Sequence, residues 1–173
     1  DIDLDGIGQL KMAEVVRMVS DKTKGEACVV VDVGQHQMVS ARYYEFKKHH
    51  SYIASGGLGT MGFAIPAALG AKMGAPDREV IAFIGDGCFQ MTIQELGTIA
   101  QSKLPIKLII LNNNYLGMVR QWQQLFFDKR YSFVELENPD FIMISKGFGL
   151  EAAKVENRED LSDAIDKMLA HDG

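Results

Sequence analysis

The segment 80-VIAFIGDGCFQMTIQELGTIAQSKLPIKLIILNNNYLG-117 predicts a strand, a helix and a second strand. Residues 80–84 and 106–111 are continuous apolar runs, which is typical of parallel strands buried on both faces. Between them, Thr92 to Glu95 has the capping-box spacing that begins a helix. The segment is therefore expected to form a βαβ unit whose two strands are parallel.

Polar residues follow each of these strands. Gly85-Asp86-Gly87 comes after the first and Asn112-Asn113-Asn114 after the second. Because parallel strands end at the same edge of a sheet, Asp86 and Asn113 are expected to lie side by side, where open α/β sheets bind ligands. A carboxylate, an amide oxygen and a backbone carbonyl from the following loop suit Mg²⁺, which relies on ligand phosphates. Each motif alone also fits an ordinary turn or helix start, but the two together predict a Mg²⁺-diphosphate site.

These motifs resemble those of the thiamine-diphosphate enzymes, in which Gly-Asp-Gly is followed further along by Asn-Asn. Residues 34–38, 55–62 and 117–123 also resemble the cofactor domain of the acetolactate synthase catalytic subunit. The resemblance implies an α/β fold, a three-layer α/β/α domain with a mostly parallel central sheet, of the thiamine-diphosphate-binding (PP) type. One departure is Val39, where the family usually has Trp.

The resemblance also implies roles for individual residues. Asp86, Asn113 and the Tyr115 backbone carbonyl would hold Mg²⁺. The Gly59 carbonyl would accept from the aminopyrimidine ring of thiamine diphosphate, and Met61 would support its bent form. Trp122 would line the channel for the second 2-keto acid. The full set implied to contact the cofactor is Gly34, Gln35, His36, Gly59, Met61, Gly85, Asp86, Gly87, Cys88, Asn113, Tyr115, Leu116, Gly117 and Met118.

The implied reaction condenses pyruvate, with loss of CO₂, with a second 2-keto acid to give a 2-acetohydroxy acid in branched-chain amino-acid biosynthesis. In this family the catalytic glutamate lies on another domain, normally supplied by a partner subunit, and any FAD lies on a middle domain. No residue of this chain is assigned a catalytic role, and the isolated chain is expected to be inactive. A homo-oligomer and a regulatory subunit are further implications.

Composition narrows the class of protein. The chain has 173 residues, of which 47% are hydrophobic and 24% charged, as in an ordinary globular domain. A net charge of −5 without a basic stripe argues against a nucleic-acid partner. No apolar run approaches the roughly 20 residues that span a bilayer. The two cysteines have no metal-site spacing, which favours a reducing cytoplasm or organelle matrix.

Periodicity predicts the remaining elements. Helices are expected at 9–21, 64–73, 118–127 and about 140–146, and a last one after an Asn157 cap. Strands are expected at 27–33 and 152–155, with a weak one at 51–55. Residues 1–8 are expected to be a linker tail of a longer polypeptide, and residues 9–173 a single cofactor domain that is cut short at its C-terminus.

Other interpretations stay open. Residues 57–62 spell GxGxxG, but an NAD site needs this motif after a buried strand and at the start of a helix. A related thiamine-diphosphate decarboxylase or oxidase would share the Asp86 and Asn113 site, and a non-catalytic module would bind the cofactor without turnover. Met61 and Trp122 could be core residues, and Cys28 an inert core thiol. His49 and His50 are expected to be solvated, since no partner stands at a fixed offset.

Overall fold

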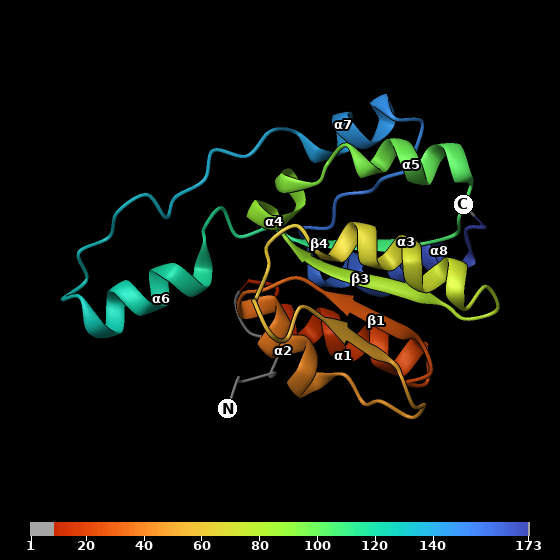
Figure 1. The fold of residues 1–173 in the computed structure, drawn as a ribbon, viewed down its shortest axis with the longest axis horizontal. Helices are drawn as coiled ribbons and strands as arrows, with labels where there is room; N and C mark the ends of the chain where they lie inside the picture. The colour runs from red at the N-terminus through yellow and green to blue at the C-terminus, as the bar shows by residue number, and fades with distance from the viewer. Residues whose placement is uncertain (1–8, 173) are drawn as a thin grey trace.

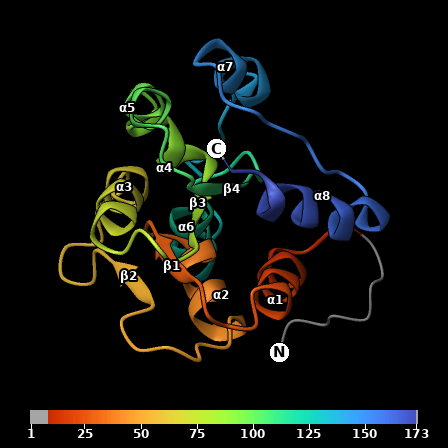
Figure 2. The ribbon, with the colours of Figure 1, turned by 90° about the vertical axis from the view of Figure 1, so that its right-hand side faces the viewer.

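The structure, a computed structural model, describes residues 9–172 as a parallel β-sheet covered by helices on both faces (Figures 1 and 2). This confirms the expected three-layer α/β/α fold, and all the strand pairs are parallel. The strands are β1 (Cys28–Val31), β2 (Tyr52–Ala54), β3 (Val80–Gly85) and β4 (Lys107–Leu111). The helices are α1 (Met12–Lys22), α2 (Gln35–Tyr43), α3 (Ala64–Gly74), α4 (Asp86–Met91), α5 (Glu95–Ser102), α6 (Gly117–Phe126), α7 (Phe141–Gly147) and α8 (Arg158–Ala170). Within residues 9–172, no helix combines the length and apolar composition needed to cross a bilayer.

The strand order is β2-β1-β3-β4, so the chain steps one way from β1 to β2 and the other way from β3 to β4. Val31 at the end of β1 is in register with Phe83, and Gly85 at the end of β3 is in register with Leu111 of β4. The loops after β1 and β3 therefore diverge around a switch point in the strand order. Ligands of open α/β sheets bind at such a point, at the carboxyl ends of the strands.

Alternate residues of the two central strands point to opposite faces of the sheet. Cys28 and Val30 of β1 join one core, while Val29 and Val31 join the other. The first core is covered by α3, α4, α5 and α7, and the second by α1, α2 and α8 (Figure 2). Two-sided burial explains why β1 and β3 are apolar at every position rather than at every second one.

Two local expectations were wrong. Thr92 does not begin a helix: its hydroxyl donates to the Gly62 carbonyl at 3.0 Å, and α5 begins only at Glu95. Glu95 instead accepts from the Thr98 hydroxyl, so the capping box does not form. The chain from Gly85 therefore enters a first helix, α4, directly at Asp86.

The expected strand at 152–155 is also not formed, since residues 151–156 have no regular secondary structure. Within this segment only Val155 packs on a core cluster, while Lys154 and Glu156 form an ion pair with each other at the surface. A single inward-facing residue gives this segment too little burial to hold it against the β4 edge. Asn157 does precede α8, but its amide donates to Asp160 and caps no backbone N–H. The expected linker tail at 1–8 lies outside the described residues.

α6 and the following loop form an arm that extends away from the sheet (Figure 1). The chain segments that enter and leave the arm are joined at its base by the backbone bonds Leu116 N–H to Val134 O and Leu136 N–H to Asn114 O. Further out, the Gln123 side chain bonds both the N–H and the carbonyl of Ser132. The helix predicted at 118–127 is found at Gly117–Phe126, and none of its residues is buried.

Glu14 joins α1 to α8. Its carboxylate accepts from the Arg158 guanidinium at 2.7 and 3.0 Å and from the Lys11 N–H at 2.7 Å. The Arg158 hydrogen bond is the main cause that lowers the pKa of Glu14 below its ordinary value of 4.5. A lowered carboxyl pKa stabilises the fold above the ordinary value, and the effect is lost as the pH falls below it.

Glu14→Gln is therefore expected to lower the free energy of unfolding at pH 7 by roughly 1 kcal/mol. The difference from the unmodified chain should shrink as the pH falls below 4.5. Urea unfolding at pH 7 and pH 3 measures both values. Glu156→Gln, which removes an exposed ion pair with Lys154, is the control and should change neither. A Glu14→Gln effect that is the same at both pH values would refute the ionic contribution.

Candidate functional site

The loops after all four strands bring the predicted site residues to one edge of the sheet. Gly34 to His36 follow β1, Gly59 and Met61 follow β2, and Gly85 to Cys88 end β3 and begin α4. The asparagines 112–114 follow β4 and lead to the Tyr115–Met118 segment at the base of α6. The sequence prediction that Asp86 and Asn113 share this edge is thus confirmed by the pairing of β3 with β4.

Asp86 is the centre of this edge. It is 2% exposed, and its Oδ2 accepts from the Asn114 N–H at 2.8 Å and from Asn138 Nδ2 at 2.7 Å. Among residues 9–172, no hydrogen bond to its other oxygen, Oδ1, is formed. A buried carboxylate with one oxygen held and one available fits a hard cation such as Mg²⁺.

Asn138 is a site residue that sequence reasoning missed. Its Nδ2 donates to Asp86, to Asn112 Oδ1 at 2.9 Å and to Asn114 Oδ1 at 2.9 Å, and its Oδ1 accepts from Gln90 at 2.8 Å. It therefore ties the loop after β4 to the start of α4. In the sequence, Asn138 and Pro139 precede a predicted helix, and no spacing pattern links Asn138 to Asp86.

Asn113 and Gly117 form the other side of the edge. Asn113 Oδ1 accepts from the Tyr115 N–H at 3.1 Å, which turns the chain sharply toward α6. A Cβ on Gly117 would lie 2.4 Å from Gln35 Oε1 and 3.3 Å from Asn113 Nδ2. Glycine lets the start of α6 approach the Gln35 side chain this closely without displacing it. Gln35 also donates to Gln121 at 3.0 Å, a contact between α2 and α6.

A depression of about 330 Å³ opens beside these residues. Arg120 is the cationic side chain in its lining, and its guanidinium stacks between the rings of Tyr115 and Tyr131, at 4.8 and 4.6 Å. The depression is thus polar and positively charged next to the candidate cation position, as a site for an anionic ligand requires. The lining residues are Gln35, Asn113, Tyr115, Gly117, Arg120, Gln121, Gln124 and Leu125.

His36 lies in α2 just behind the edge, with 5% of its surface exposed. A Cβ on Gly34 would lie 3.0 Å from its Nδ1, and so would a Cβ on Gly85. The two glycines therefore leave the space that the imidazole ring fills, and Gly34 has φ of 145°. Burial lowers the pKa of His36 to about 4, so the ring is neutral at pH 7.

The glycine segment after β2 lies beside α4. Gly59 has φ of 58°, and Met61 Cε would be 3.7 Å from a Cβ on Gly87. Met61 therefore faces the first turn of α4, although it also packs on the first core. The GxGxxG of residues 57–62 lies just before α3, but the strand that precedes it is a three-residue edge strand with no buried residue. This context is not that of a dinucleotide site.

Asp32, which sequence reasoning also missed, holds this segment in place. It ends the apolar run of β1, is 1% exposed, and accepts from the Ala64 N–H at 2.9 Å at the start of α3. Burial raises its pKa, and hydrogen bonds from the backbones of Ala64, Phe63 and Gly62 oppose that rise. The sequence signal that could have identified Asp32 is an acidic residue at the end of a buried strand, because acidic side chains are rarely buried without a partner.

Asp32→Ala is expected to be less stable than Asp32→Asn by about 1–3 kcal/mol, because only asparagine keeps an oxygen for the N–H groups of α3. The comparison removes the charge in both variants and so isolates the hydrogen bonds. Urea unfolding of the two variants measures the difference. Equal stabilities would mean that Asp32 does not hold the first turn of α3.

The other residues singled out in the sequence are two cysteines in the interior, a tryptophan on the arm and two histidines at the surface. The Cys88 side chain points into the interior, where its thiol donates weakly to Val33 O at 3.5 Å and burial raises its pKa to about 12. Cys28 is a buried core residue, as expected. Trp122 is 54% exposed and packs on Phe126, with 5.1 Å between ring centres, so it is not a core residue. His49 and His50 are exposed, as expected.

Comparison with known proteins gives a family match. Residues 32–173 match the family described as "Thiamine pyrophosphate enzyme, C-terminal TPP binding domain". The chain is 44% identical over 160 residues to the acetolactate synthase isozyme 2 large subunit of Escherichia coli K12, covering 92% of this chain and 29% of that protein. It is 51% identical over 158 residues to the acetolactate synthase large subunit of Corynebacterium glutamicum, covering 88% of this chain and 25% of that protein.

Among solved structures, the chain resembles the thiamine diphosphate-dependent 4-hydroxybenzoylformate decarboxylase of Rhodococcus jostii RHA1. The TM-score is 0.88 at 28% identity, over 99% of this chain and 32% of that one. The chain thus spans about a quarter to a third of the length of the proteins it matches.

Proposed function

This chain belongs to the thiamine pyrophosphate enzymes, as their C-terminal TPP binding domain, and from this we propose that it is the cofactor domain of an acetolactate synthase catalytic subunit. In that role it binds thiamine diphosphate with Mg²⁺ at the carboxyl edge of its sheet. The observation that carries the proposal is the position of Asp86, whose Oδ2 holds the loop after β4 through the Asn114 N–H at 2.8 Å. The identities of 44% and 51% to acetolactate synthase large subunits support the choice of enzyme.

Mg²⁺ is held by Asp86, Asn113 and the backbone carbonyl of Tyr115. Asp86 supplies the negative charge, and Asn113 and Tyr115 supply neutral oxygens, a set small enough to leave coordination positions for phosphate and water. The hydrogen bonds from Asn138 and Asn114 orient the Asp86 carboxylate before any ligand arrives. This orientation lowers the cost of organising the site on binding.

The diphosphate is bound by the segments that begin three helices. Gly34, Gln35 and His36 approach it at the start of α2, Gly85, Gly87 and Cys88 at the start of α4, and Leu116, Gly117 and Met118 at the start of α6. Free backbone N–H groups at helix starts favour an anion. The Cys88 side chain is turned inward, so this residue contributes its backbone.

The segment after β2 receives the aminopyrimidine ring, with the Gly59 carbonyl as acceptor and Met61 as a polarisable surface beneath it. The position of Met61 beside Gly87 supports this role, because it lies next to the loop expected to hold the diphosphate. When bound, thiamine diphosphate supplies the electron sink that lets a 2-keto acid lose CO₂. The substrates are then pyruvate and a second 2-keto acid, and the product is a 2-acetohydroxy acid of branched-chain amino-acid biosynthesis.

The catalytic glutamate comes from another domain, on a partner subunit, and FAD, where present, is bound by a middle domain. The arm supports such a partner, since the apolar residues Val119, Trp122, Leu125, Phe126 and Phe127 are all exposed on it. A surface of this kind marks an interface.

The working enzyme is accordingly a homo-oligomer in the cytoplasm or an organelle matrix, with Trp122 at the substrate channel. A regulatory subunit is consistent with relatives that are named large subunits.

The second candidate is a thiamine-diphosphate decarboxylase, and the likeness to the Rhodococcus decarboxylase favours it. It would use the same Mg²⁺ site but release an aldehyde from a single 2-keto acid. An NAD oxidoreductase would bind nucleotide without Mg²⁺, and a non-catalytic module would bind the cofactor and never turn over.

A hybrid enzyme tests these alternatives. The matching C-terminal segment of the Escherichia coli isozyme 2 large subunit is replaced by this chain, and acetolactate formed from pyruvate is measured. We expect the hybrid to form acetolactate in the presence of thiamine diphosphate and Mg²⁺, and the 173-residue chain alone to form none. Acetaldehyde as the main product would favour the decarboxylase, and cofactor binding without any product would favour the module. Appreciable acetolactate from the chain alone would contradict the division of the site between domains.

A further inference from the structure

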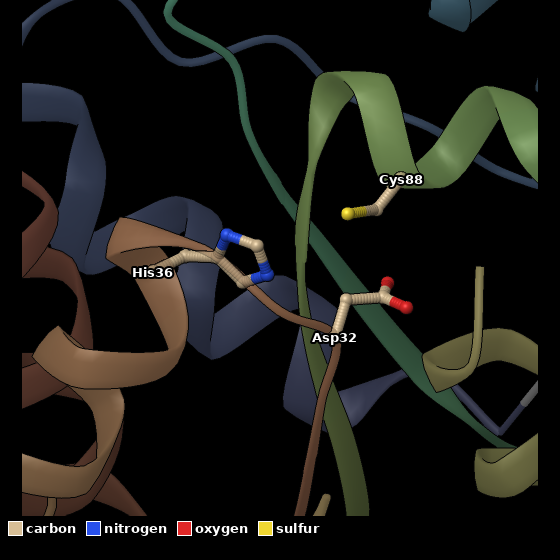
Figure 3. Close-up of side chains that lie close together, drawn as sticks. All are labelled: Asp32, His36 and Cys88. Carbon is tan, nitrogen blue, oxygen red and sulfur yellow. The ribbon is translucent and has the colours of Figure 1, made fainter. Parts of the chain in front are cut away.

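Three side chains with metal-binding atoms converge just beneath the sheet edge (Figure 3). Asp32 follows β1, His36 lies in α2 and Cys88 lies in α4. One oxygen, nitrogen or sulfur atom from each lies within 4.8 Å of the others. The three residues are 1%, 5% and 3% exposed, so the cluster is shielded from solvent.

The polar atoms of this cluster are incompletely satisfied. Asp32 Oδ2 and His36 Nε2 are both buried without a hydrogen-bond partner, and Cys88 Sγ bonds only backbone groups, weakly to the Val33 carbonyl at 3.5 Å and also to Gly62. Asp32 Oδ1 is already used by the Ala64 N–H. Native proteins rarely leave buried polar atoms in this state, and an unseen water or ion is the usual explanation.

The acidic groups of the cluster can balance the charge of a cation. No lysine or arginine from the part of the chain that the structure describes forms an ion pair with Asp32, so its carboxylate is buried without a positive partner. A divalent cation would balance one carboxylate and one thiolate, with the imidazole neutral.

We propose that Asp32, His36 and Cys88 form a buried site for one divalent transition-metal ion of the Zn²⁺ class. Carboxylate oxygen, imidazole nitrogen and thiolate sulfur are the ligands that Zn²⁺ takes, at about 2.0–2.3 Å. Ligand atoms within 4.8 Å of one another need only small side-chain rotations to share one such ion. Binding releases the Cys88 thiol proton to solvent, and a water completes four-fold coordination.

This site is separate from the proposed Mg²⁺ site. Mg²⁺ prefers oxygen ligands, and Asp86 offers one, whereas the thiolate of the Asp32–His36–Cys88 cluster selects a softer ion. Asp32 and Asp86 follow the paired strands β1 and β3, but their carboxylates have different partners: Asp32 accepts from the Ala64 N–H, and Asp86 accepts from the Asn114 N–H. The inner ion would fix the ring of His36 from behind, through Nε2, while Nδ1 stays between Gly34 and Gly85.

Cobalt titration of the full 173-residue chain tests the proposal, because a Co²⁺–thiolate bond gives a charge-transfer absorption. After treatment with a chelator, the chain should bind one Co²⁺ and develop this band, and excess Mg²⁺ should not remove it. Cys88→Ser should lose the band, whereas Cys28→Ser, which changes the other buried cysteine, should keep it. A band that survives Cys88→Ser, or no bound cobalt, overturns the proposal in favour of a buried water.

A second measurement needs no variant. Zinc X-ray absorption of the unmodified chain should find one sulfur among four ligands, and a shell without sulfur or with more than one overturns the proposal. This measurement decides the matter if Cys88→Ser fails to fold by circular dichroism. Asp86→Asn should keep the cobalt band and lose thiamine diphosphate binding, so failure of one site is distinguishable from failure of the other.

Discussion

Asp86→Asn is expected to weaken Mg²⁺-dependent binding of thiamine diphosphate by at least about 100-fold, since loss of an outer-shell partner alone costs 10–100-fold. Asparagine has the size of aspartate and keeps an oxygen to accept the Asn114 N–H, now at 2.8 Å. The substitution therefore removes the charge and leaves the loop after β4 in place. Mg²⁺ is bound weakly by neutral oxygens alone, so the cofactor loses its metal bridge to the protein.

The measurement is the concentration of thiamine diphosphate that gives half-maximal activity of the hybrid enzyme at several Mg²⁺ concentrations. Asp163→Asn, an exposed aspartate of α8, makes the same chemical change far from the edge and should leave this value unchanged. If Asp86→Asn also left it unchanged while the variant stayed folded, Asp86 would not be the metal ligand.

The position of Asp86 was predictable because it depends on two local signals. Continuous apolar runs predict parallel strands buried on both faces, and β3 has that character, whereas β4 is an edge strand whose three central residues are only partly buried. Parallel strands end at the same edge, so the residues that follow them are neighbours however long the connection is. The same reasoning placed Gly34 after β1 and the three asparagines after β4 without knowledge of the side-chain contacts.

Asn138 and Asp32 were not predictable in this way. Asn138 reaches Asp86 across 52 positions of the chain, and Asp32 reaches Ala64 across 32. Such contacts depend on the path of the loops in space, which the periodicity of the sequence does not predict. Thr92 shows the opposite case. The capping-box spacing is present in the sequence, but the Thr92 hydroxyl donates to the Gly62 carbonyl of another loop and does not cap a helix.

The arm shows a third limit. Val119, Trp122 and Phe126 have the spacing of a buried helix face, yet each is exposed. An amphipathic pattern predicts that an apolar face will be covered, but not what covers it. The amphipathic pattern therefore predicts the extent of α6 to within one residue, but it does not predict which surface covers the apolar face of the helix.

Phe89→Ala is expected to lower the free energy of unfolding by about 3–5 kcal/mol. Phe89 is 1% exposed and packs edge-on against Phe141, with 5.1 Å between the ring centres. Removing its ring leaves a cavity between α4 and α7. Because total stabilities are only about 5–15 kcal/mol, this loss is a large fraction of the whole.

The matched control is Phe133→Ala, which removes an equal side chain that is 98% exposed on the arm. It should change the stability by less than about 0.5 kcal/mol. Urea unfolding of the unmodified chain and both variants measures the difference. Phe89 lies in the same helix as Asp86, so Phe89→Ala should also weaken Mg²⁺-dependent cofactor binding under conditions where the variant remains folded. Equal stabilities of the two variants would show that Phe89 is not what holds α4, and with it Asp86, against the first core.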